Sequence, residues 1–351
     1  MLNVNKMTDL SDRQRFLLSL VIHEYIRSAN PVGSKHMVDQ YQLDMSSATV
    51  RNELAMLTEM GYLRQPHLSA GRVPTEDGYR LFVGNIVQET ELPDSTRRTI
   101  SHQFYQMRQD VEGWTKLAAS VLAHQSRAAS LVTAPHPDQS RFKHLELISA
   151  RGSQVLMVLV LMGGEILQRF ITLPEPVLQE HLSSTADLLN NLLMGRNVSE
   201  ISAESTEFAP LERDVYQLVI DEMTQADSMI SGDVVLDGLT NVLAEPEFSA
   251  GGEARRALRV LEEKPLLNDI LSKTVLGGSS LGGVQVLIGG EGIYDALSQC
   301  SIVLARYGTP GLATGTLGVL GPMRMPYGRT ISIVRFLSSL LSDLVNETMA
   351  E

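Results

Sequence analysis

Hydrogen-bonding side chains suited to reading DNA gather between Leu43 and Pro74, in the stretch LDMSSATVRNELAMLTEMGYLRQPHLSAGRVP. Small and hydrogen-bonding residues, among them Thr49, Arg51 and Asn52, fill the first turns of what the spacing predicts to be a helix. Such residues suit a helix whose start enters a major groove, where arginine pairs with guanine and asparagine with adenine through two hydrogen bonds. An ordinary helix with a solvated polar face is the alternative interpretation.

A β-hairpin is predicted directly after this helix. Its parts are the strand Tyr62–Gln65, the turn Ser69–Gly71 and the return strand Arg72–Val73. Arg64, His67 and Arg72 would then lie on the hairpin, where basic side chains can reach DNA phosphates.

The spacing of apolar and capping residues predicts how the helix is held. Ser46 or Ser47 can cap its start, because a short side-chain oxygen accepts a hydrogen bond from a free N–H of the first turn. Residues at helical spacing predict a buried stripe made of Val50, Leu54, Leu57 and Gly61. Gly61 is also expected to end the helix.

Further helices are predicted on both sides of this stretch. Ser11 and Gln14 have the spacing of a capping box, and the Asn-Pro-Val-Gly run at 30–33 ends the helix that they begin. Ser34 is expected to cap a short second helix, and Thr75 to cap another after the hairpin. Three helices and a hairpin within about 75 residues predict a winged helix-turn-helix.

The remaining chain alternates helical and strand patterns. Helical patterns cover 95–129, 178–194, 197–272 (including 211–223 and 253–263), 294–299 and 327–344, and strand patterns cover 142–148, 155–161, 166–171, 284–288, 301–307 and 316–320. A β-rich region that stops for an acidic helical block and then resumes suggests a domain inserted into an α+β domain. The predicted fold class is therefore α+β and multidomain.

Composition limits the class of protein. A length of 351 residues and a hydrophobic content of 43% support two or three domains with real cores. The net charge of −12 argues against a protein that coats nucleic acid indiscriminately. Residues 1–90, however, hold 9 Lys and Arg against 10 Asp and Glu, so the acidity lies outside the candidate DNA-binding segment. The single cysteine, the polar first ten residues and the absence of a membrane-length apolar run indicate a cytoplasmic protein.

The chain shows little that is typical of an enzyme. The glycine-rich stretch 277–283 precedes a predicted strand, the reverse of a phosphate-binding loop, and 289–292 lacks the lysine of such a loop. The eight histidines show no metal-ligand spacing on one helix face. Cys300 lies where a predicted helix passes into an apolar strand, which favours a buried thiol over a nucleophile. The sequence therefore predicts no enzyme, no cofactor and no metal site.

Four motifs together carry a family resemblance. SSATVRNELAMLTEMGYL and SAGRVPTEDGYR are highly specific in combination, and VLIGGEG and GPMRMPYGRTISIV in the C-terminal part agree with them. On these motifs the chain resembles the heat-inducible transcription repressor HrcA family of bacteria. The resemblance covers essentially the whole chain and is weakest over residues 195–272.

The resemblance implies a protein in three parts. Residues 1–93 would form a winged-helix DNA-binding domain, 94–194 and 273–351 the two parts of a GAF-like domain, and 195–272 an inserted dimerising domain. It also implies a homodimer that binds an inverted-repeat operator in double-stranded DNA, the CIRCE element, and represses chaperone operons. The chaperonin GroEL is implied as the partner that modulates this activity. A ligand-responsive regulator whose GAF-like domain senses a small metabolite is the alternative.

The resemblance further implies which residues contact DNA. They are Ser46, Ser47, Thr49, Arg51 and Asn52 in the helix and Arg64, His67, Ser69 and Arg72 in the hairpin. Arg51 and Asn52 are expected to read bases, and the basic residues of the hairpin to hold phosphates. A salt bridge to a neighbouring acid is the alternative for Arg51. Glu53 is expected to face away from DNA, because phosphates repel it.

Overall fold

The computed structural model describes residues 10–85, 91–107, 110–136, 139–162, 164–203, 206–228, 234–249, 283–289, 297–309 and 311–349, together with residues 259, 260, 263, 267 and 270. These residues form helices and antiparallel sheets, which confirms the predicted α+β class. They group into two compact units. The first consists of Met1–Ala134, Val234–Tyr307 and Thr316–Leu344, and the second of Pro135–Asp233, Gly308–Gly315 and Val345–Glu351.

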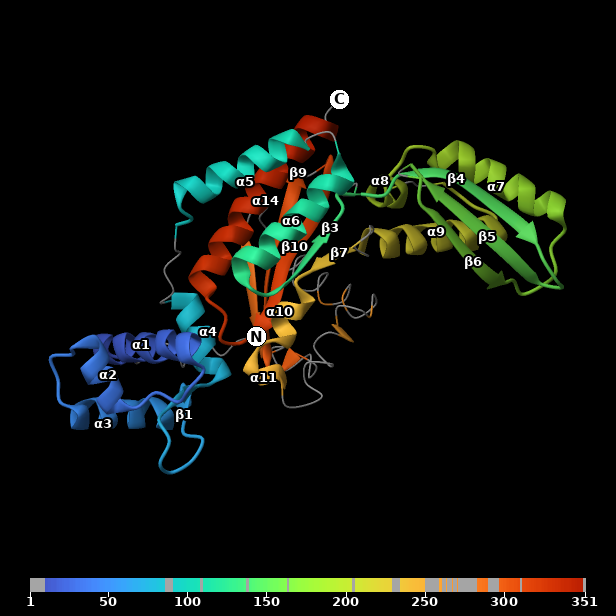
Figure 1. Ribbon diagram of the computed structural model, residues 1–351. Helices are drawn as coiled ribbons and strands as arrows, with labels where there is room; N and C mark the ends of the chain where they lie inside the picture. Colours follow the sequence, from blue (N-terminus) through green and yellow to red (C-terminus); the bar gives the residue numbers. More distant parts are fainter. Residues whose placement is uncertain are drawn as a thin grey trace. The chain divides into compact units, whose positions relative to one another are not determined.

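The head, residues 10–85, begins the first unit (Figure 1). Its elements are α1 (Asp12–Ser28), α2 (Ser34–Tyr41), α3 (Ser47–Glu59), β1 (Leu63–Arg64), β2 (Val73–Pro74) and α4 (Glu76–Asn85). The predicted caps at Ser11 and Thr75 are present, because Ser11 and Gln14 form a capping box and Thr75 Oγ1 accepts the Gly78 N–H at 3.1 Å. The predicted cap at Ser34 is wrong, because Ser34 is the first residue of α2 and the cap position is Gly33, which makes no side-chain hydrogen bond. The helices share buried apolar residues that include Leu17, Val21, Met37, Leu57 and Phe82.

The rest of the first unit is built on a five-stranded sheet in the order β7-β3-β10-β9-β8. Its strands are β3 (Ala129–Thr133), β7 (Val234–Asp237), β8 (Val284–Ile288), β9 (Cys300–Thr309) and β10 (Ala313–Pro322), and its helices are α5 (Asp94–Gln106), α6 (Val111–Ser126), α10 (Leu239–Leu243), α11 (Pro246–Ser249) and α14 (Tyr327–Met349). Strand β10 is buried along its whole length, so the centre of the sheet is covered on both faces. Trp114 of α6 packs edge-on against Tyr307 of β9, with ring centroids 6.1 Å apart.

Two strands of this sheet are not predicted by the sequence pattern. Strand β3 is five residues long and buried throughout, so it shows no alternation of polar and apolar residues. Strand β7 lies in a region predicted to be helical. It pairs with β3 so that Ser130 lies opposite Asp237, 107 residues later. The pattern predicted as one helical region over 95–129 is in fact two helices, α5 and α6.

The second unit contains an antiparallel sheet in the order β4-β5-β6. Its elements are β4 (Phe142–Ser149), β5 (Gln154–Leu161), β6 (Ile166–Thr172), α7 (Gln179–Leu193), α8 (Val198–Ser202) and α9 (Pro210–Ser228). Alternate residues of β5, such as Val155 and Met157, share a core with Leu189 of α7 and Val219 of α9. One face of this sheet is therefore covered by helices.

The opposite face of this sheet carries apolar residues in register across the three strands. One row is Ile148, Leu156 and Phe170, another is Val160 and Ile166, and Val158 lies between them. We call these six residues the open sheet face. Phe170 is 65% exposed and Ile166 58% exposed. Polar residues lie beside the apolar ones on the same face, since Glu146 and Gln168 pair with Val158, and His144 pairs with Val160.

The elements are grouped differently from the predicted domain ranges. The predictions divide the chain after residues 194 and 272, whereas β4–β6 and α7–α9 all lie within Pro135–Asp233, in one compact unit. Strands β8, β9 and β10 belong instead to the sheet that contains β3. A sequence pattern marks a strand but not its partner, because pairing depends on contacts between distant residues. The assignment of a GAF-like part and a dimerising part stays a prediction.

Several expectations from the sequence concern local features. The predicted helices 253–263 and 294–299 and the glycine-rich stretches 277–283 and 289–292 fall largely outside the described residues. Cys300 is buried at the start of β9. Among the residues that the structure describes, no helix is long and apolar enough to cross a membrane. In the same part of the chain, no three His, Cys, Asp or Glu side chains are grouped to hold a metal ion.

Candidate nucleic-acid interface

Helix α3 begins with a side-chain cap that fixes its first turn. Ser46 Oγ accepts the Thr49 N–H at 3.1 Å and lies 3.0 Å from Thr49 Oγ1. Ser47 is the first helical residue and is exposed. Of the predicted stripe, Val50, Leu54 and Leu57 are buried. Gly61 is exposed and not part of the stripe, but its φ of +88° marks the end of the helix, since glycine adopts this conformation without strain.

The open face of α3 presents Arg51 and Asn52. Both residues are exposed, and neither side chain has a hydrogen-bond or ion-pair partner among the described residues. The salt bridge considered as an alternative for Arg51 is therefore not formed with any acid that the structure describes. Glu53 faces α1 instead, where its carboxylate accepts from Gln14 Nε2 at 3.2 Å and lies 3.7 Å from the guanidinium of Arg13. These contacts hold Glu53 against α1, and its orientation relative to DNA stays a prediction.

The hairpin is anchored to the loop that joins α1 and α2. Strands β1 and β2 pair in antiparallel register, with Arg64 opposite Val73. The Val32 N–H donates to Arg72 O at 2.9 Å, and the Arg72 N–H donates to Val32 O at 2.8 Å. This bridge adds a third strand segment to the hairpin and fixes its direction relative to the helices.

Gly71→Ala is expected to break this bridge. A Cβ at Gly71 would lie 2.4 Å from the carbonyl carbon of Val32, which is backbone and cannot turn aside. Overpacking of this kind costs about 1–3 kcal/mol, and here it displaces the hairpin. Hydrogen exchange at the Val32 and Arg72 amides should rise in this variant. Gly84→Ala is the matched control, because a Cβ at Gly84 meets nothing within 4 Å; a similar exchange rate in both variants would contradict the role of the bridge.

The hairpin loop, residues 65–71, is held by the side chain of Gln65. Its Nε2 donates to Leu68 O at 2.9 Å and to Ala70 O at 3.0 Å. His67 and Ser69 are exposed on either side of Leu68, at the tip of the loop. The sequence does not show that the Gln65 side chain holds the loop or that Leu68 is fully exposed. A single leucine among turn-forming residues is the feature of the sequence that points to this position.

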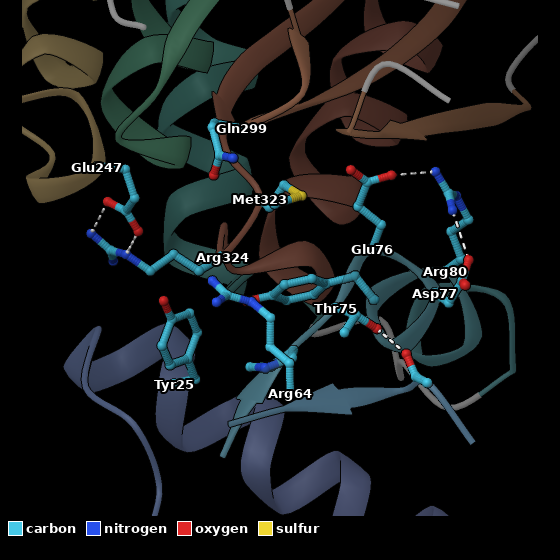
Figure 2. A pocket seen from close by; sticks show the side chains of 13 residues that line it. Tyr25, Arg64, Thr75, Glu76, Asp77, Arg80, Glu247, Gln299, Met323 and Arg324 are labelled. Carbon is cyan, nitrogen blue, oxygen red and sulfur yellow. Dashed lines mark hydrogen bonds and ion pairs between the residues drawn. The ribbon is translucent and has the colours of Figure 1, made fainter. Parts of the chain in front are cut away.

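The other two basic residues of the hairpin have different surroundings. Arg72 is half-buried, and its Nε donates to Thr58 Oγ1 of α3 at 2.9 Å. Arg72 therefore ties the hairpin to the helix. Arg64 is exposed, but it lines a cavity of about 540 Å³ together with Tyr25 and Arg324 (Figure 2). Of the three basic residues, His67 is the one that lies at the loop tip.

Charged residues around this cavity join the head to the sheet of the first unit. Arg80 of α4 pairs with Glu76 at 2.9 Å and Asp77 at 2.8 Å, and it also donates to Ile288 O of β8 at 3.1 Å. Arg324 pairs with Glu245 and Glu247 and donates to the carbonyl of Ile26 in α1 at 3.4 Å. The sequence does not indicate this connection, because the contacts that Arg324 makes and the contact of Arg80 with Ile288 join residues 77 to 298 positions apart.

Glu24 of α1 links this helix to α2. Its nearly buried carboxylate accepts from Arg27 Nη2 at 2.9 Å and from the Tyr41 hydroxyl at 3.0 Å, and it lies 3.2 Å from His36 Nε2. Burial alone would raise the pKa of Glu24. The hydrogen bonds from Arg27, Tyr41 and His36 outweigh burial, so the pKa lies below its ordinary value.

Glu24→Gln is expected to lower the free energy of unfolding at pH 7 by about 1–3 kcal/mol, since it removes hydrogen bonds to a buried charge. Because the folded pKa lies below the unfolded value of about 4.3, the stabilisation is complete at neutral pH and is lost as the pH falls through the folded pKa. Thermal unfolding followed by circular dichroism should show the parent and the variant converging in acid. Glu112→Gln, which loses only an exposed pair with Lys116, is the control. A constant gap between parent and Glu24→Gln across pH would contradict the assignment.

Comparisons with known proteins agree with the motifs of the head and extend beyond it. Residues 112–331 match the family model described as HrcA protein C terminal domain. A heat-inducible transcription repressor HrcA from Roseiflexus castenholzii is 43% identical over 97% of this chain and 96% of its own length. The repressor of the same name from Roseiflexus sp. strain RS-1 is 44% identical, with the same coverage of both chains.

A solved structure shows the same fold. It is described as the crystal structure of a hypothetical protein at 2.2 Å resolution, and it aligns with a TM-score of 0.56 at 23% identity over 97% of this chain and 98% of that chain. At this identity the likeness concerns the fold alone. The sequence relatives, which cover nearly the full chain at more than 40% identity, identify the family. The chain belongs to the HrcA family of heat-inducible transcription repressors, which is a family of regulators and not of enzymes.

Proposed function

We propose that this protein is a sequence-specific repressor that binds the inverted-repeat CIRCE operator of chaperone operons as a homodimer in the cytoplasm. The observation that carries the proposal is the surface of α3. Arg51 and Asn52 lie exposed on a capped helix, with no partner among the described residues, on a chain of a repressor family. Side chains of these two types recognise guanine and adenine through pairs of hydrogen bonds.

The head supports the geometry of a winged helix-turn-helix. In this arrangement α3 enters the major groove with its N-terminal turns, and the hairpin lies beside it on the backbone. Ser46 and Thr49 hold the first turn, and Arg72 holds the hairpin against α3. His67 and Ser69 are exposed at the loop tip, where they can hydrogen-bond to phosphates. Arg64 reaches a phosphate only after it leaves the cavity that it lines.

The nearly neutral charge of the head supports DNA binding through a small number of phosphate contacts. The segment 1–90 is nearly neutral, while the chain as a whole carries −12. Each phosphate that a basic side chain neutralises steepens the decrease in affinity with salt. We therefore expect the affinity to fall as the salt concentration rises and the specificity to be set mainly by base contacts.

The open sheet face supports the homodimer. It presents six apolar residues in register on one side of β4–β6, and the helices α7 and α9 cover only the other side. In a two-fold dimer the same patch meets itself, so one apolar face is sufficient for both partners. Two-fold symmetry of the protein then matches the two-fold symmetry of an inverted repeat.

The proposal includes the chaperonin GroEL as a partner that modulates repression, which is what the family resemblance implies. Transcription in vitro from a promoter that carries the inverted repeat tests the whole proposal. Full-length protein should reduce the transcript, and added chaperonin should increase that reduction at a fixed repressor concentration. A promoter with a scrambled repeat is the control. An undiminished transcript at saturating protein would overturn the proposal.

A further inference from the structure

Leu68, at the tip of the hairpin loop, is the most exposed of the large apolar side chains in the described part of the chain. Its surface is 100% accessible. Single exposed apolar residues are common on proteins and need no explanation by themselves. Two further features set Leu68 apart: the bracing of the loop that carries it, and the surface to which that loop belongs.

The loop holds Leu68 away from the protein. Gln65 donates two hydrogen bonds, to the carbonyls of Leu68 and Ala70, and the Ala70 N–H donates to His67 O at 2.8 Å. These bonds fix the backbone on both sides of Leu68. A loop whose backbone is already fixed loses little backbone freedom when a partner covers it.

The surroundings of Leu68 favour nucleic acid as that partner. The neighbouring His67 and Ser69 are exposed hydrogen-bonding residues. The loop extends beyond α3, on the side of the head away from α1 (Figure 1). A protein-docking surface gathers several apolar residues, whereas proteins that enter a minor groove use single apolar side chains beside polar ones.

We propose that Leu68 enters the minor groove next to the major groove that α3 occupies, and that it selects A·T pairs there. The inference rests on the proposed function. A G·C pair presents the guanine amino group in the minor groove, whereas an A·T pair has no such group there. A leucine placed over a G·C pair would bury this hydrogen-bond donor without an acceptor, which costs free energy. Leu68 thus adds specificity at a position that Arg51 and Asn52 do not reach.

Operators with one modified adenine at a time test this inference. 2,6-Diaminopurine adds an amino group in the minor groove and keeps the major-groove pattern of adenine. At one symmetric pair of positions it should weaken binding by the parent and by Leu68→Met about tenfold, the usual penalty for one unfavourable base pair. Leu68→Ala should bind the natural operator more weakly and respond little to the modification. Leu243→Ala, another exposed leucine in α10, should behave as the parent.

The outcomes separate this inference from the proposed function. If the parent prefers the inverted repeat but no position responds to diaminopurine, Leu68 does not enter the minor groove, and the proposed function stands. The same holds if Leu68→Ala matches the parent on every duplex. If the parent shows no preference for the inverted repeat, both the function and this inference fail.

Discussion

Arg51→Ala and Asn52→Ala are each expected to weaken binding to the inverted-repeat operator by about 10- to 100-fold, because a two-bond contact to a base contributes about 1–3 kcal/mol. Both side chains are exposed and have no partner among the described residues, so their loss should leave the fold unchanged. Fluorescence anisotropy with a labelled operator measures the affinity. Thermal unfolding of the same samples confirms that the variants are folded.

The control for Arg51→Ala is Arg98→Ala, which removes an exposed positive charge from α5, outside the head. Its affinity for the operator should equal that of the parent. If Arg51 contacts a phosphate instead of a base, Arg51→Ala would lower the affinity for all DNA sequences alike. The slope of log affinity against log salt concentration would then decrease by about one, since one counterion fewer is released. Parent-like affinity in both head variants would contradict the proposed readout.

Phe170→Asp is expected to convert the proposed dimer into monomers. Phe170 lies opposite Leu156 on the open sheet face and is 65% exposed, so the change costs little within one chain. In a two-fold interface each partner contributes the same new carboxylate. Both carboxylates would be desolvated in an apolar contact, which opposes association. Sedimentation velocity should show a monomer. Affinity for the full inverted repeat should decrease by about 100-fold or more, because the two heads no longer bind as one unit.

Leu178→Asp is the matched control for this variant. Leu178 is 71% exposed and precedes α7, which covers the other face of the sheet. An aspartate there can also cap the helix, so stability should not fall. A Leu178→Asp dimer beside a Phe170→Asp monomer would assign self-association to the open sheet face. A dimer in both variants would place the interface elsewhere.

Features that depend on neighbouring residues could be predicted from the sequence. The caps at Ser11 and Ser46 and the end of α3 at Gly61 each involve residues within four positions of one another. The apolar spacing of Val50, Leu54 and Leu57 likewise determines which face of α3 is buried. The position of Arg51 and Asn52 on the opposite face follows from the same periodicity.

Features that depend on distant partners could not be predicted. Strand β3 is recognisable only by its pairing with β7 and β10, which lie far along the chain. The direction of a long side chain depends in the same way on what surrounds it. Arg72 turns to Thr58 and Arg64 lines a cavity with Arg324, although both residues fit the pattern of a phosphate contact. These two positions show why residue type and spacing alone do not assign a phosphate contact.

The most direct test of the proposed function is a titration of the full-length protein at physiological salt with the inverted repeat and with a scrambled duplex of the same composition. A specific repressor should bind the inverted repeat at least about 1,000-fold more tightly, with two chains on each duplex. Equal affinity for the two duplexes, with parallel salt dependence, would show that binding is electrostatic alone and would contradict base readout by α3.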